Sequence, residues 1–401
     1  MPADNGAVRV QQTEITELEK MMSTEEKNLC VQTETVSEKQ PLSELVQPLL
    51  AWYDRSHRSL PWREEPTPYR VWISEIMLQQ TRVEAVKPYY DRFLKALPDI
   101  RHLAEVPEEE LLKLWEGLGY YNRARNLKKA AIIIEETYGG EMPGRYEELM
   151  KLPGIGSYTA GAIASIAFGQ KAAAVDGNVL RILARALMDD GDIMDQKVRR
   201  RVEESLLAVM PEGRAGDFNQ ALMELGAMVC IPNGAPKCEE CPWHDLCRAR
   251  VQERIPEYPK KSPKKPRTTE EKTILILQDE NRTALRKRPS KGLLAGMYEF
   301  PSLPGHQSEK EILSYLDTLG YHAVRIRRLE DARHIFTHKE WDMIGYAVRV
   351  DELDRPEFKG KAPFLFAENG ETEEKYPIPS AFSKYAQYVR LRLGNERLKG
   401  K

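Results

Sequence analysis

The stretch LPGIGSYTAGA, residues 152–162, combines a proline and three glycines with the start of an apolar run that extends to Ala167. Gly154 and Gly156 permit a turn in which a side chain would clash, and the apolar run predicts a helix directly after that turn. The first amide groups of such a helix have no partner within it, so they can bind an anion. The stretch equally fits an ordinary tight joint between two helices.

Helical spacing of apolar residues continues on both sides of this stretch, from Pro41 to about Arg250, with glycine and proline between the segments. Residues 41–250 therefore predict an all-α domain. Residues 1–40 differ, because they carry eight acidic and four basic residues and few large apolar ones. We expect this segment to be a disordered, polar and acidic tail.

The composition changes again after the helical region. Residues 251–272 are rich in proline and lysine, which favours an extended linker, although a basic run of this kind is also typical of a nuclear address. Residues 273–401 then predict an α+β or α/β domain with three strands, one helix between them and a final amphipathic helix. The strands are expected at 272–278, 322–328 and 343–350, and the helices at 308–320 and through 381–393.

Overall composition sets further limits. A chain of 401 residues can form two or three domains, and 41% hydrophobic with 30% charged residues is typical of globular proteins. No apolar run approaches the roughly 18 residues of a membrane span, and no signal-peptide pattern precedes the first domain. We therefore expect an intracellular protein without a membrane partner. The net charge of −2 implies that any surface for nucleic acid is local.

Four of the five cysteines lie close together, in the spacing C-x7-C-x2-C-x5-C. Four thiolates can hold a tetrahedral zinc ion or a 4Fe–4S cluster, and a single C-x2-C with unequal arms fits the cluster at least as well. Four unrelated buried cysteines are the remaining interpretation. The candidate ligands are Cys230, Cys238, Cys241 and Cys247.

Two carboxylates are candidates for acid–base chemistry. Glu75 lies in the apolar segment VWISEIMLQQT, where an inward-facing carboxyl would have a raised pKa and could act as a general acid. A surface glutamate on an amphipathic helix is the simpler interpretation. Asp176 precedes Gly177 and Asn178, so it could cap the next helix, and a carboxylate held by capping amides stays ionised.

Several motifs together resemble a known superfamily. LPGIGSYTAGA, VDGN at 175–178 and the four-cysteine loop resemble the helix-hairpin-helix DNA glycosylases that include endonuclease III. Within that superfamily, four further motifs resemble the adenine glycosylase family MutY, and HIFTHKEW at 334–341 extends the likeness into a second, Nudix-like domain. The four motifs are PWR at 61–63, SEIMLQQT at 74–81, GLGYYNRARNL at 117–127 and FNQALMELGA at 218–227.

The resemblance implies an all-α helix-hairpin-helix glycosylase domain with an iron–sulfur loop, followed by an α+β Nudix-like domain. It implies base-excision repair, in which adenine is removed from duplex DNA where it lies opposite 8-oxoguanine or guanine. A monomer would carry this out, in the cytoplasm with the nucleoid if the source is bacterial, or otherwise in a nucleus. The implied cofactor is a 4Fe–4S cluster on the four cysteines.

The resemblance also implies residue roles. Glu75 would protonate the extruded adenine and Asp176 would stabilise the sugar cation, while Tyr158 and Asn178 would orient the sugar, Asp176 and water. Further residues would contact DNA or its bases. These are Arg63 and Gln220 at the adenine, Gln80 and Tyr120 as wedges, Gly154 and Gly156 at a phosphate, and Phe336, Thr337 and His338 at the opposite 8-oxoguanine.

Three features depart from related patterns. The first cysteine interval is one residue longer than the family's usual six, and Thr337 replaces the serine of the usual Phe-Ser-His loop. Bifunctional lyases of the superfamily carry a lysine near the hairpin, whereas this chain has Tyr158, and a phenol cannot form an imine. We therefore expect a monofunctional enzyme that hydrolyses the glycosidic bond.

Other functions remain as alternatives. An endonuclease III-like lyase and a non-catalytic iron–sulfur DNA-binding protein are the nearest two. An active Nudix hydrolase is disfavoured, because no cluster of acidic residues follows GLLAGMYEF at 292–300. His334 and His338 have the spacing of a metal pair but lack an acidic third ligand. Four basic residues could contact the DNA backbone or form a solvated face: Arg123, Arg125, Lys128 and Lys129.

Overall fold

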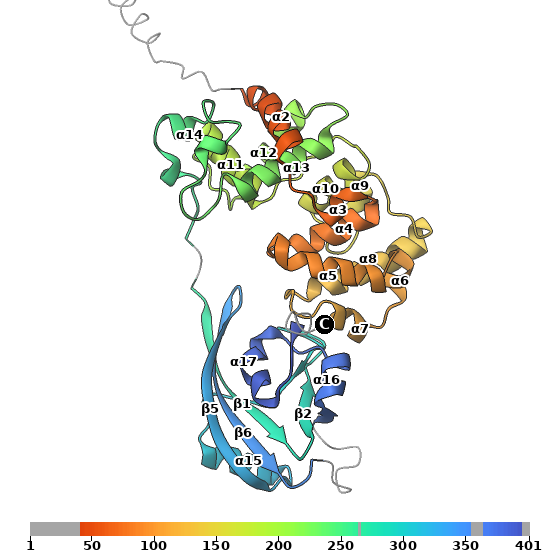
Figure 1. Cartoon of the computed structure of the whole chain (residues 1–401), viewed down its shortest axis with the longest axis vertical. Coiled ribbons are helices and arrows are strands. Elements are labelled where there is room, and N and C mark those ends of the chain that lie inside the picture. The colour runs from red at the N-terminus through yellow and green to blue at the C-terminus, as the bar shows by residue number, and fades with distance from the viewer. Residues whose placement is uncertain (1–40, 264–265, 354–363, 395–401) are drawn as a thin grey trace, which may run out of the picture.

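The computed structural model describes residues 41–263, 266–353 and 364–394, which form a helical domain followed by a domain built on a curved sheet (Figure 1). The expected tail at 1–40 lies outside the described residues. Across the described part, no helix has the length and apolar character needed to cross a bilayer. The expected fold class, all-α followed by α+β, is confirmed.

The helical domain begins at residue 42 and continues beyond the cysteine loop. Its elements are η1 Leu42–Leu45, α2 Val46–Ser56, α3 Pro61–Glu64, α4 Pro68–Leu78, α5 Val83–Ala96, α6 Ile100–Glu105, α7 Glu108–Leu114, α8 Asn122–Tyr138, α9 Tyr146–Leu149, α10 Ser157–Ile166, α11 Gly177–Leu187, α12 Gln196–Val209, α13 Ala215–Met228, η2 Cys238–Glu240, α14 Arg248–Val251 and η3 Ile255–Glu257.

Two hydrophobic cores divide this domain. The first is built mainly by α4 to α8 and α10, and the second by α2 and α11 to α13. Helix α10 packs against α4 on one side and α13 on the other, so it joins the two cores. The hairpin glycines directly precede α10, and Glu75 and Asp176 belong to α4 and to the start of α11. The residues proposed for chemistry therefore come from both sides of the junction.

The expected linker is shorter than its composition suggests. Tyr258 is 3% exposed, and its hydroxyl donates to Asp190 over 3.0 Å. The amide of Ser262 donates to Asp192 over 3.1 Å, so the chain stays attached to the helical domain as far as residue 262. Strand β1 (Thr268–Gln278) then begins four residues before the expected strand at 272–278.

The C-terminal sheet has the strand order β3-β2-β1-β6-β5, with β4 beside β1 and β7 beside β2. Among the strand pairs of the described residues, only β1–β6 is parallel. Core residues of α15 cover one face and the C-terminal segment covers the other. The further elements are β2 Arg282–Lys287, β3 Tyr298–Glu299, β4 Ser302–Pro304, α15 Glu309–Thr318, β5 Ala323–Ile335, β6 Lys339–Val350, β7 Leu365–Glu368, α16 Asn369–Lys375, η5 Ser380–Phe382, α17 Ser383–Ala386 and η6 Gln387–Val389.

The final amphipathic helix expected through 381–393 is wrong. The segment forms η5, the single-turn α17 and η6, and it ends at Arg390 with a φ of +56°. Leu391 and Leu393 both join the core under the sheet. Residues two apart point to opposite sides of a helix, so a continuous helix could not bury both of them.

Candidate active site and cysteine loop

Glu75 faces inward from α4 and is 6% exposed, so the surface interpretation of this residue is wrong. Its Oε2 accepts a hydrogen bond of 2.6 Å from the hydroxyl of Tyr158, the second residue of α10. Burial raises the pKa of Glu75 to about 7, although the Tyr158 hydrogen bond opposes this shift, and the charge of Asp176 adds to it. At neutral pH this carboxyl is therefore close to half protonated.

Asp176 is the N-cap of α11, as its position before Gly177 and Asn178 predicts. Its Oδ1 accepts from the amide of Val179 over 2.8 Å, and its Oδ2 accepts from the side chain of Asn178 over 2.7 Å. Burial nevertheless raises the pKa of Asp176, and these hydrogen bonds only partly oppose the shift. The expectation from the sequence included only the capping hydrogen bonds, which favour the ionised form of Asp176, and not the effect of burial.

Arg63 and Gln220 lie together, as the resemblance implies, since Nε of Arg63 donates to Oε1 of Gln220 over 3.0 Å. Sequence reasoning missed their partner, Glu224, which is 1% exposed and binds Arg63 over 3.0 Å and Arg58 over 2.7 Å. Burial would raise the pKa of Glu224, but the hydrogen bonds from Arg58 and Arg63 outweigh it and lower the pKa to about 2. The sequence feature that could have drawn attention to Glu224 is its place as a charged residue within the apolar face of α13.

The hairpin turn presents free amides at an exposed surface. Gly154 has a φ of +79°, and a Cβ there would lie 2.7 Å from Cβ of Asn126, so only glycine fits. Gly156 is the N-cap of α10 and offers no side chain to the first amides of the helix. A Cβ at Gly156 would meet no protein atom within 4 Å, so an external group can approach there. The geometry suits an anion.

Gln80 and Tyr120 have the same unusual backbone conformation. Their φ angles are +58° and +47°, a region that residues other than glycine rarely occupy, and both side chains are exposed. Such strain is typical of functional positions when neighbouring groups enforce it. Arg123 is the enforcing group here, because its guanidinium donates to the carbonyls of Gln79 over 2.7 Å and Leu118 over 3.0 Å.

Both sequence interpretations of Arg123 are therefore wrong. It neither lies on a solvated face nor points to DNA, since burial lowers its pKa to about 10 and its hydrogen bonds go to backbone carbonyls. Arg125 binds Glu108 over 2.8 Å and the carbonyl of Ala295, and Lys128 binds the carbonyl of Val106. Of the four basic residues considered, Lys129 alone is exposed without such a bond in the described part of the chain.

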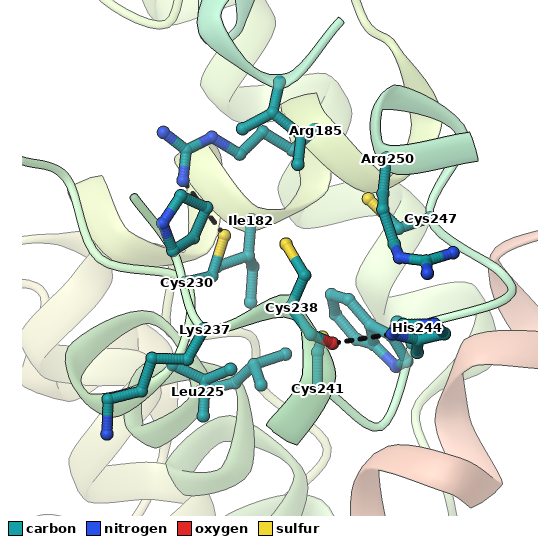
Figure 2. A pocket seen from close by; sticks show the side chains of 14 residues that line it. Ile182, Arg185, Leu225, Cys230, Lys237, Cys238, Cys241, His244, Cys247 and Arg250 are labelled. Atoms are coloured by element: carbon teal, nitrogen blue, oxygen red, sulfur yellow. Dashed lines mark hydrogen bonds between the residues drawn. The ribbon is translucent and has the colours of Figure 1, made fainter. Parts of the chain in front are cut away.

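The four cysteines line one pocket at the end of α13, in which Cys230 and Cys238 lie next to each other (Figure 2). None of them forms a disulfide. Hydrogen bonds fix the loop, because the amide of Cys230 donates to Leu225 over 2.9 Å and the indole of Trp243 donates to Leu45 over 2.9 Å. Arg185 reaches in from α11 and donates to Sγ of Cys230 over 3.2 Å.

Burial acts on the thiols of this pocket. It raises the pKa of Cys241 to about 12, and the charges of the neighbouring thiolates raise it further, so the protein alone disfavours the thiolate form of Cys241. Among the described residues, no three side chains of histidine, cysteine, aspartate or glutamate surround a point that one metal ion could occupy. The four thiols nevertheless line one pocket, so they remain candidate ligands of one bound group.

One arginine connects this loop with the carboxylate site. Arg181, on α11, donates through Nε to the carbonyl of Cys230 over 2.9 Å and through Nη2 to Oδ1 of Asn178 over 2.9 Å. Its Nη2 also donates to the carbonyl of Gly226 over 2.7 Å. Sequence reasoning missed Arg181, because its position on α11 indicates only a charged residue on a mostly apolar helix.

Phe336, Thr337 and His338 form the turn between β5 and β6. The hydroxyl of Thr337 lies 3.1 Å from that of Tyr120, which belongs to the helical domain. The ring of Phe336 packs edge-on against Trp341 at 4.9 Å and against His334 at 4.7 Å. His334 is thus packed on an aromatic ring, and no metal site of three ligands includes it or His338 within the described residues.

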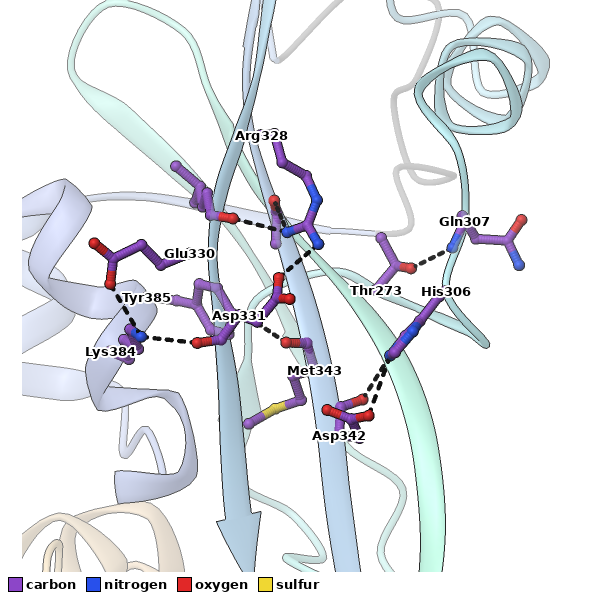
Figure 3. A network of polar contacts seen from close by, with 12 residues as sticks. Thr273, His306, Gln307, Arg328, Glu330, Asp331, Asp342, Met343, Lys384 and Tyr385 are labelled. Atoms are coloured by element: carbon purple, nitrogen blue, oxygen red, sulfur yellow. Dashed lines mark hydrogen bonds and ion pairs between the residues drawn. The ribbon is translucent and has the colours of Figure 1, made fainter.

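Contacts beneath the sheet fix the strands that carry this turn. Figure 3 shows Lys384 and Tyr385 of α17 reaching β5 and β6. Lys384 donates to the carbonyl of Asp331 over 2.7 Å, and the hydroxyl of Tyr385 donates to the carbonyl of Met343 over 3.0 Å. The turn at 336–338 is therefore supported from within its own domain as well as by Tyr120.

Comparisons with known proteins agree with the two-domain division. Residues 73–207 match the family model of HhH-GPD superfamily base excision DNA repair proteins, and residues 273–388 match that of the NUDIX domain. Among solved structures, a non-covalent endonuclease III–DNA complex is 28% identical, with a TM-score of 0.46, and the match covers 53% of this chain and 96% of that one.

Curated relatives match over both domains. The adenine DNA glycosylase of Mus musculus is 36% identical over 362 residues, which are 76% of this chain and 70% of the relative. That of Homo sapiens is 37% identical over 350 residues, 72% of this chain and 64% of the relative. That of Buchnera aphidicola subsp. Baizongia pistaciae is 36% identical over 296 residues, 73% of this chain and 82% of the relative. This chain therefore belongs to the adenine DNA glycosylase family of helix-hairpin-helix base excision repair proteins.

Proposed function

We propose that this protein is a monofunctional adenine DNA glycosylase that hydrolyses the glycosidic bond of adenine paired with 8-oxoguanine or guanine in duplex DNA. The observation that carries the proposal is the buried Glu75, whose pKa of about 7 keeps a proton available at neutral pH. Asp176 supplies a second carboxylate with different hydrogen bonds. Enzymes that cleave glycosidic bonds commonly use two carboxyl groups in different environments as their catalytic groups.

The reaction begins with extrusion of the adenine, because its reacting atoms are hidden in the duplex. The Glu75 carboxyl transfers its proton to N7 of adenine, and the C1′–N9 bond breaks with its electron pair going to the base. Asp176 stabilises the positive charge that develops on the sugar. Water then adds its oxygen to C1′ and gives up a proton, which returns to the Glu75 carboxylate. Asn178 and Tyr158 hold Asp176 and Glu75 in place through hydrogen bonds of 2.7 and 2.6 Å.

Arg63 and Gln220 are proposed to contact the extruded adenine. They already share a hydrogen bond, and Glu224 holds the Arg63 guanidinium, so the adenine would meet groups in fixed positions. Fixed polar groups favour one orientation of a bound base because they need no reorganisation when it arrives.

Tyr158 supports hydrolysis over a lyase reaction. A lyase forms an imine between a lysine amine and the sugar, and a phenol cannot do this. The Tyr158 hydroxyl is also occupied by its hydrogen bond to Glu75, and its own pKa is raised well above the ordinary value by burial. The DNA strand would therefore remain intact after base removal.

Recognition of the opposite base is proposed to lie at the turn of Phe336, Thr337 and His338, next to Tyr120. Adenine itself is a normal base, so the enzyme must read the lesion on the other strand. The Thr337 hydroxyl can donate and accept hydrogen bonds, as the serine of related loops can. The strained, exposed Gln80 and Tyr120 are proposed to enter the base stack.

The hairpin glycines are proposed to hold a phosphate of the DNA backbone at the amides before α10. The exposed turn and the absence of a side-chain cap support this role. Phosphate contacts of this kind set the position of the duplex and do not select a base. We propose that the protein acts as a monomer.

The cysteine loop is proposed to hold a 4Fe–4S cluster through Cys230, Cys238, Cys241 and Cys247. Four thiols line one pocket, and a single C-x2-C with unequal arms suits a cluster at least as well as zinc. Such a cluster supplies iron–thiolate bonds that fix the loop. The loop in turn contacts Arg181 and Arg185 of α11, the helix that Asp176 caps.

The test is single-turnover cleavage of a duplex with adenine opposite 8-oxoguanine, analysed with and without hot alkali. Native protein should produce strand breaks only after alkali, and Glu75→Gln should abolish them while duplex binding persists. Glu147→Gln is the matched control, because that glutamate has an exposed side chain. Breaks without alkali would identify a lyase, and intact DNA under all conditions would leave only a binding protein.

A further inference from the structure

The two domains are joined by a buried contact that the proposed chemistry does not use. Met297, in the segment before β3, is 0% exposed and belongs to the hydrophobic core formed by α4 to α8 in the other domain. Leu294, three residues earlier, packs against that core and also against the core under the sheet. The sheet domain thus inserts an apolar anchor into the helical domain.

Beside this anchor lies a buried ion pair. Nζ of Lys113, on α7, lies 3.0 Å from Oε2 of Glu116, and the two side chains are 9% and 2% exposed. Both are bound by the backbone of the sheet domain, because the amide of Ile378 donates to Oε1 of Glu116 over 2.9 Å and Nζ of Lys113 donates to the carbonyl of Tyr376 over 2.9 Å. A buried pair tolerates few alternative arrangements, since any displacement leaves a charge without its partners.

The contact continues toward the DNA-reading residues. Gly117 follows Glu116 with a φ of +101°, and a Cβ there would lie 3.2 Å from Cα of Gly394 in the sheet domain. Three residues later, Tyr120 meets Thr337 across the same boundary, with hydroxyl oxygens 3.1 Å apart. One short stretch of chain, 113–120, therefore holds both the buried contact and the exposed pair.

We propose that Met297 and the Lys113–Glu116 pair are positioning residues for lesion discrimination. They fix the turn at 336–338 against Tyr120, so that the opposite base meets both groups at once. Without this contact the domain boundary would be held by more exposed bonds such as Lys287–Glu109, and the effective concentration of the turn at Tyr120 would fall. The inference rests on the proposed reading of 8-oxoguanine by Thr337.

The test uses full-length variants of two kinds. Met297→Ala removes the anchor, and the double variant Lys113→Met with Glu116→Gln replaces the ion pair by neutral side chains of similar size. The matched control is Lys287→Ala, because Lys287 pairs with Glu109 at the rim of the same contact and its side chain is 52% exposed. Exposed ion pairs of this kind contribute little to stability, so we expect this variant to keep the domain contact.

Two measurements are needed. The first is the ratio of single-turnover rates for adenine opposite 8-oxoguanine and opposite guanine, which should fall by about tenfold in both test variants through loss of effective concentration. The rate opposite guanine should change by less than about twofold, since the catalytic groups are untouched. The second is hydrogen exchange of peptides containing Ile378, which should become faster in the double variant.

The outcomes separate this inference from the proposed function. A parallel fall of both rates, or an unchanged ratio despite faster exchange at Ile378, would overturn the positioning role. Thr337→Ala serves as the reference: if it lowers the ratio while the interface variants do not, the inference alone fails. If Thr337→Ala also leaves the ratio unchanged, the proposed reading of 8-oxoguanine fails first.

Discussion

Arg181 and Asn178 are joined by a hydrogen bond of 2.9 Å between Nη2 and Oδ1, one turn into the helix that Asp176 caps. The side chain of Asn178 in turn donates a hydrogen bond of 2.7 Å to Asp176. Arg181 also donates to the carbonyl of Cys230. The orientation of the Asp176 carboxylate is thus linked to the cysteine loop through Asn178 and Arg181.

Replacing Arg181 by methionine should therefore slow base removal more than it weakens DNA binding. We expect the single-turnover rate to fall at least about tenfold, because misplacing a reacting group by even a small distance is costly, while duplex affinity stays within about threefold. Arg181→Lys keeps the charge but not the planar fork, so it should rescue only part of the rate. An equal loss of affinity and rate in Arg181→Met would argue for general misfolding.

The pH dependence of base removal should report Glu75. Its proton is required and its pKa is about 7, so the rate should fall about tenfold per pH unit above that value. The hydrogen bond from Tyr158 lowers this pKa, so Tyr158→Phe should move the basic limb to higher pH. Only the position of the limb tests this, since the plateau rate will also change. A limb at unchanged or lower pH would contradict the assignment.

The same carboxyl should reduce stability at high pH. Its pKa is raised in the folded state from 4.5 to about 7, so the folded state binds the proton more tightly than the unfolded state. Its contribution to stability is therefore present below pH 4.5 and is lost as the pH rises through 7. Glu75→Gln should raise the free energy of unfolding, because glutamine has no proton to lose. This increase should be larger at pH 8 than at pH 5.5, by on the order of 2 kcal/mol. Denaturant titrations of both proteins at both pH values check this, with Glu147→Gln as control.

Thr337→Ala should lower the preference for adenine opposite 8-oxoguanine over adenine opposite guanine. The variant loses a hydroxyl that could bind the lesion and the 3.1 Å contact with Tyr120, which we expect to reduce the ratio of single-turnover rates by about tenfold. Tyr120→Phe provides the comparison, because it removes the same contact while keeping the ring. Should the two variants give the same ratio, Thr337 would act through Tyr120 and not through the base.

Metal content of the purified protein should identify the group on the cysteine loop. We expect visible absorbance together with iron and acid-labile sulfide, and only trace zinc. Replacing Cys241 by serine should remove the absorbance and destabilise the protein by several kcal/mol, because metal binding is coupled to loop folding. One zinc ion per chain without sulfide would reject the cluster.

Local patterns in the sequence predicted much of the framework. The capping role of Asp176 follows from an acidic residue before Gly177 and Asn178, and the sharp turn at Gly154 follows from its glycine and proline neighbours. Helix α15 lies within the expected range 308–320, and the cysteine spacing identified the four residues that share a pocket. Each signal lies within a few residues of the feature that it specifies.

Partners distant in the sequence escaped prediction. Arg58 and Glu224 are 166 residues apart, and nothing in either segment indicates that they form an ion pair. The basic residues near 123–128 illustrate the same problem, since their charge suggested DNA, whereas their side chains bind backbone carbonyls of other segments. The final segment was mistaken for one helix because its apolar spacing does not reveal that the sheet needs Leu391 and Leu393 on the same side.

The sequence by itself determined the order of the two domains, the hairpin turn, the capped carboxylate and the set of four cysteines, because short-range backbone preferences and ligand spacing are local properties. Only the tertiary structure decided that Glu75 faces inward beside Tyr158, that Arg181 spans the cysteine loop and Asn178, and that Tyr120 meets Thr337. Those relationships set burial, pKa and position, and each depends on which segments the folded cores bring together.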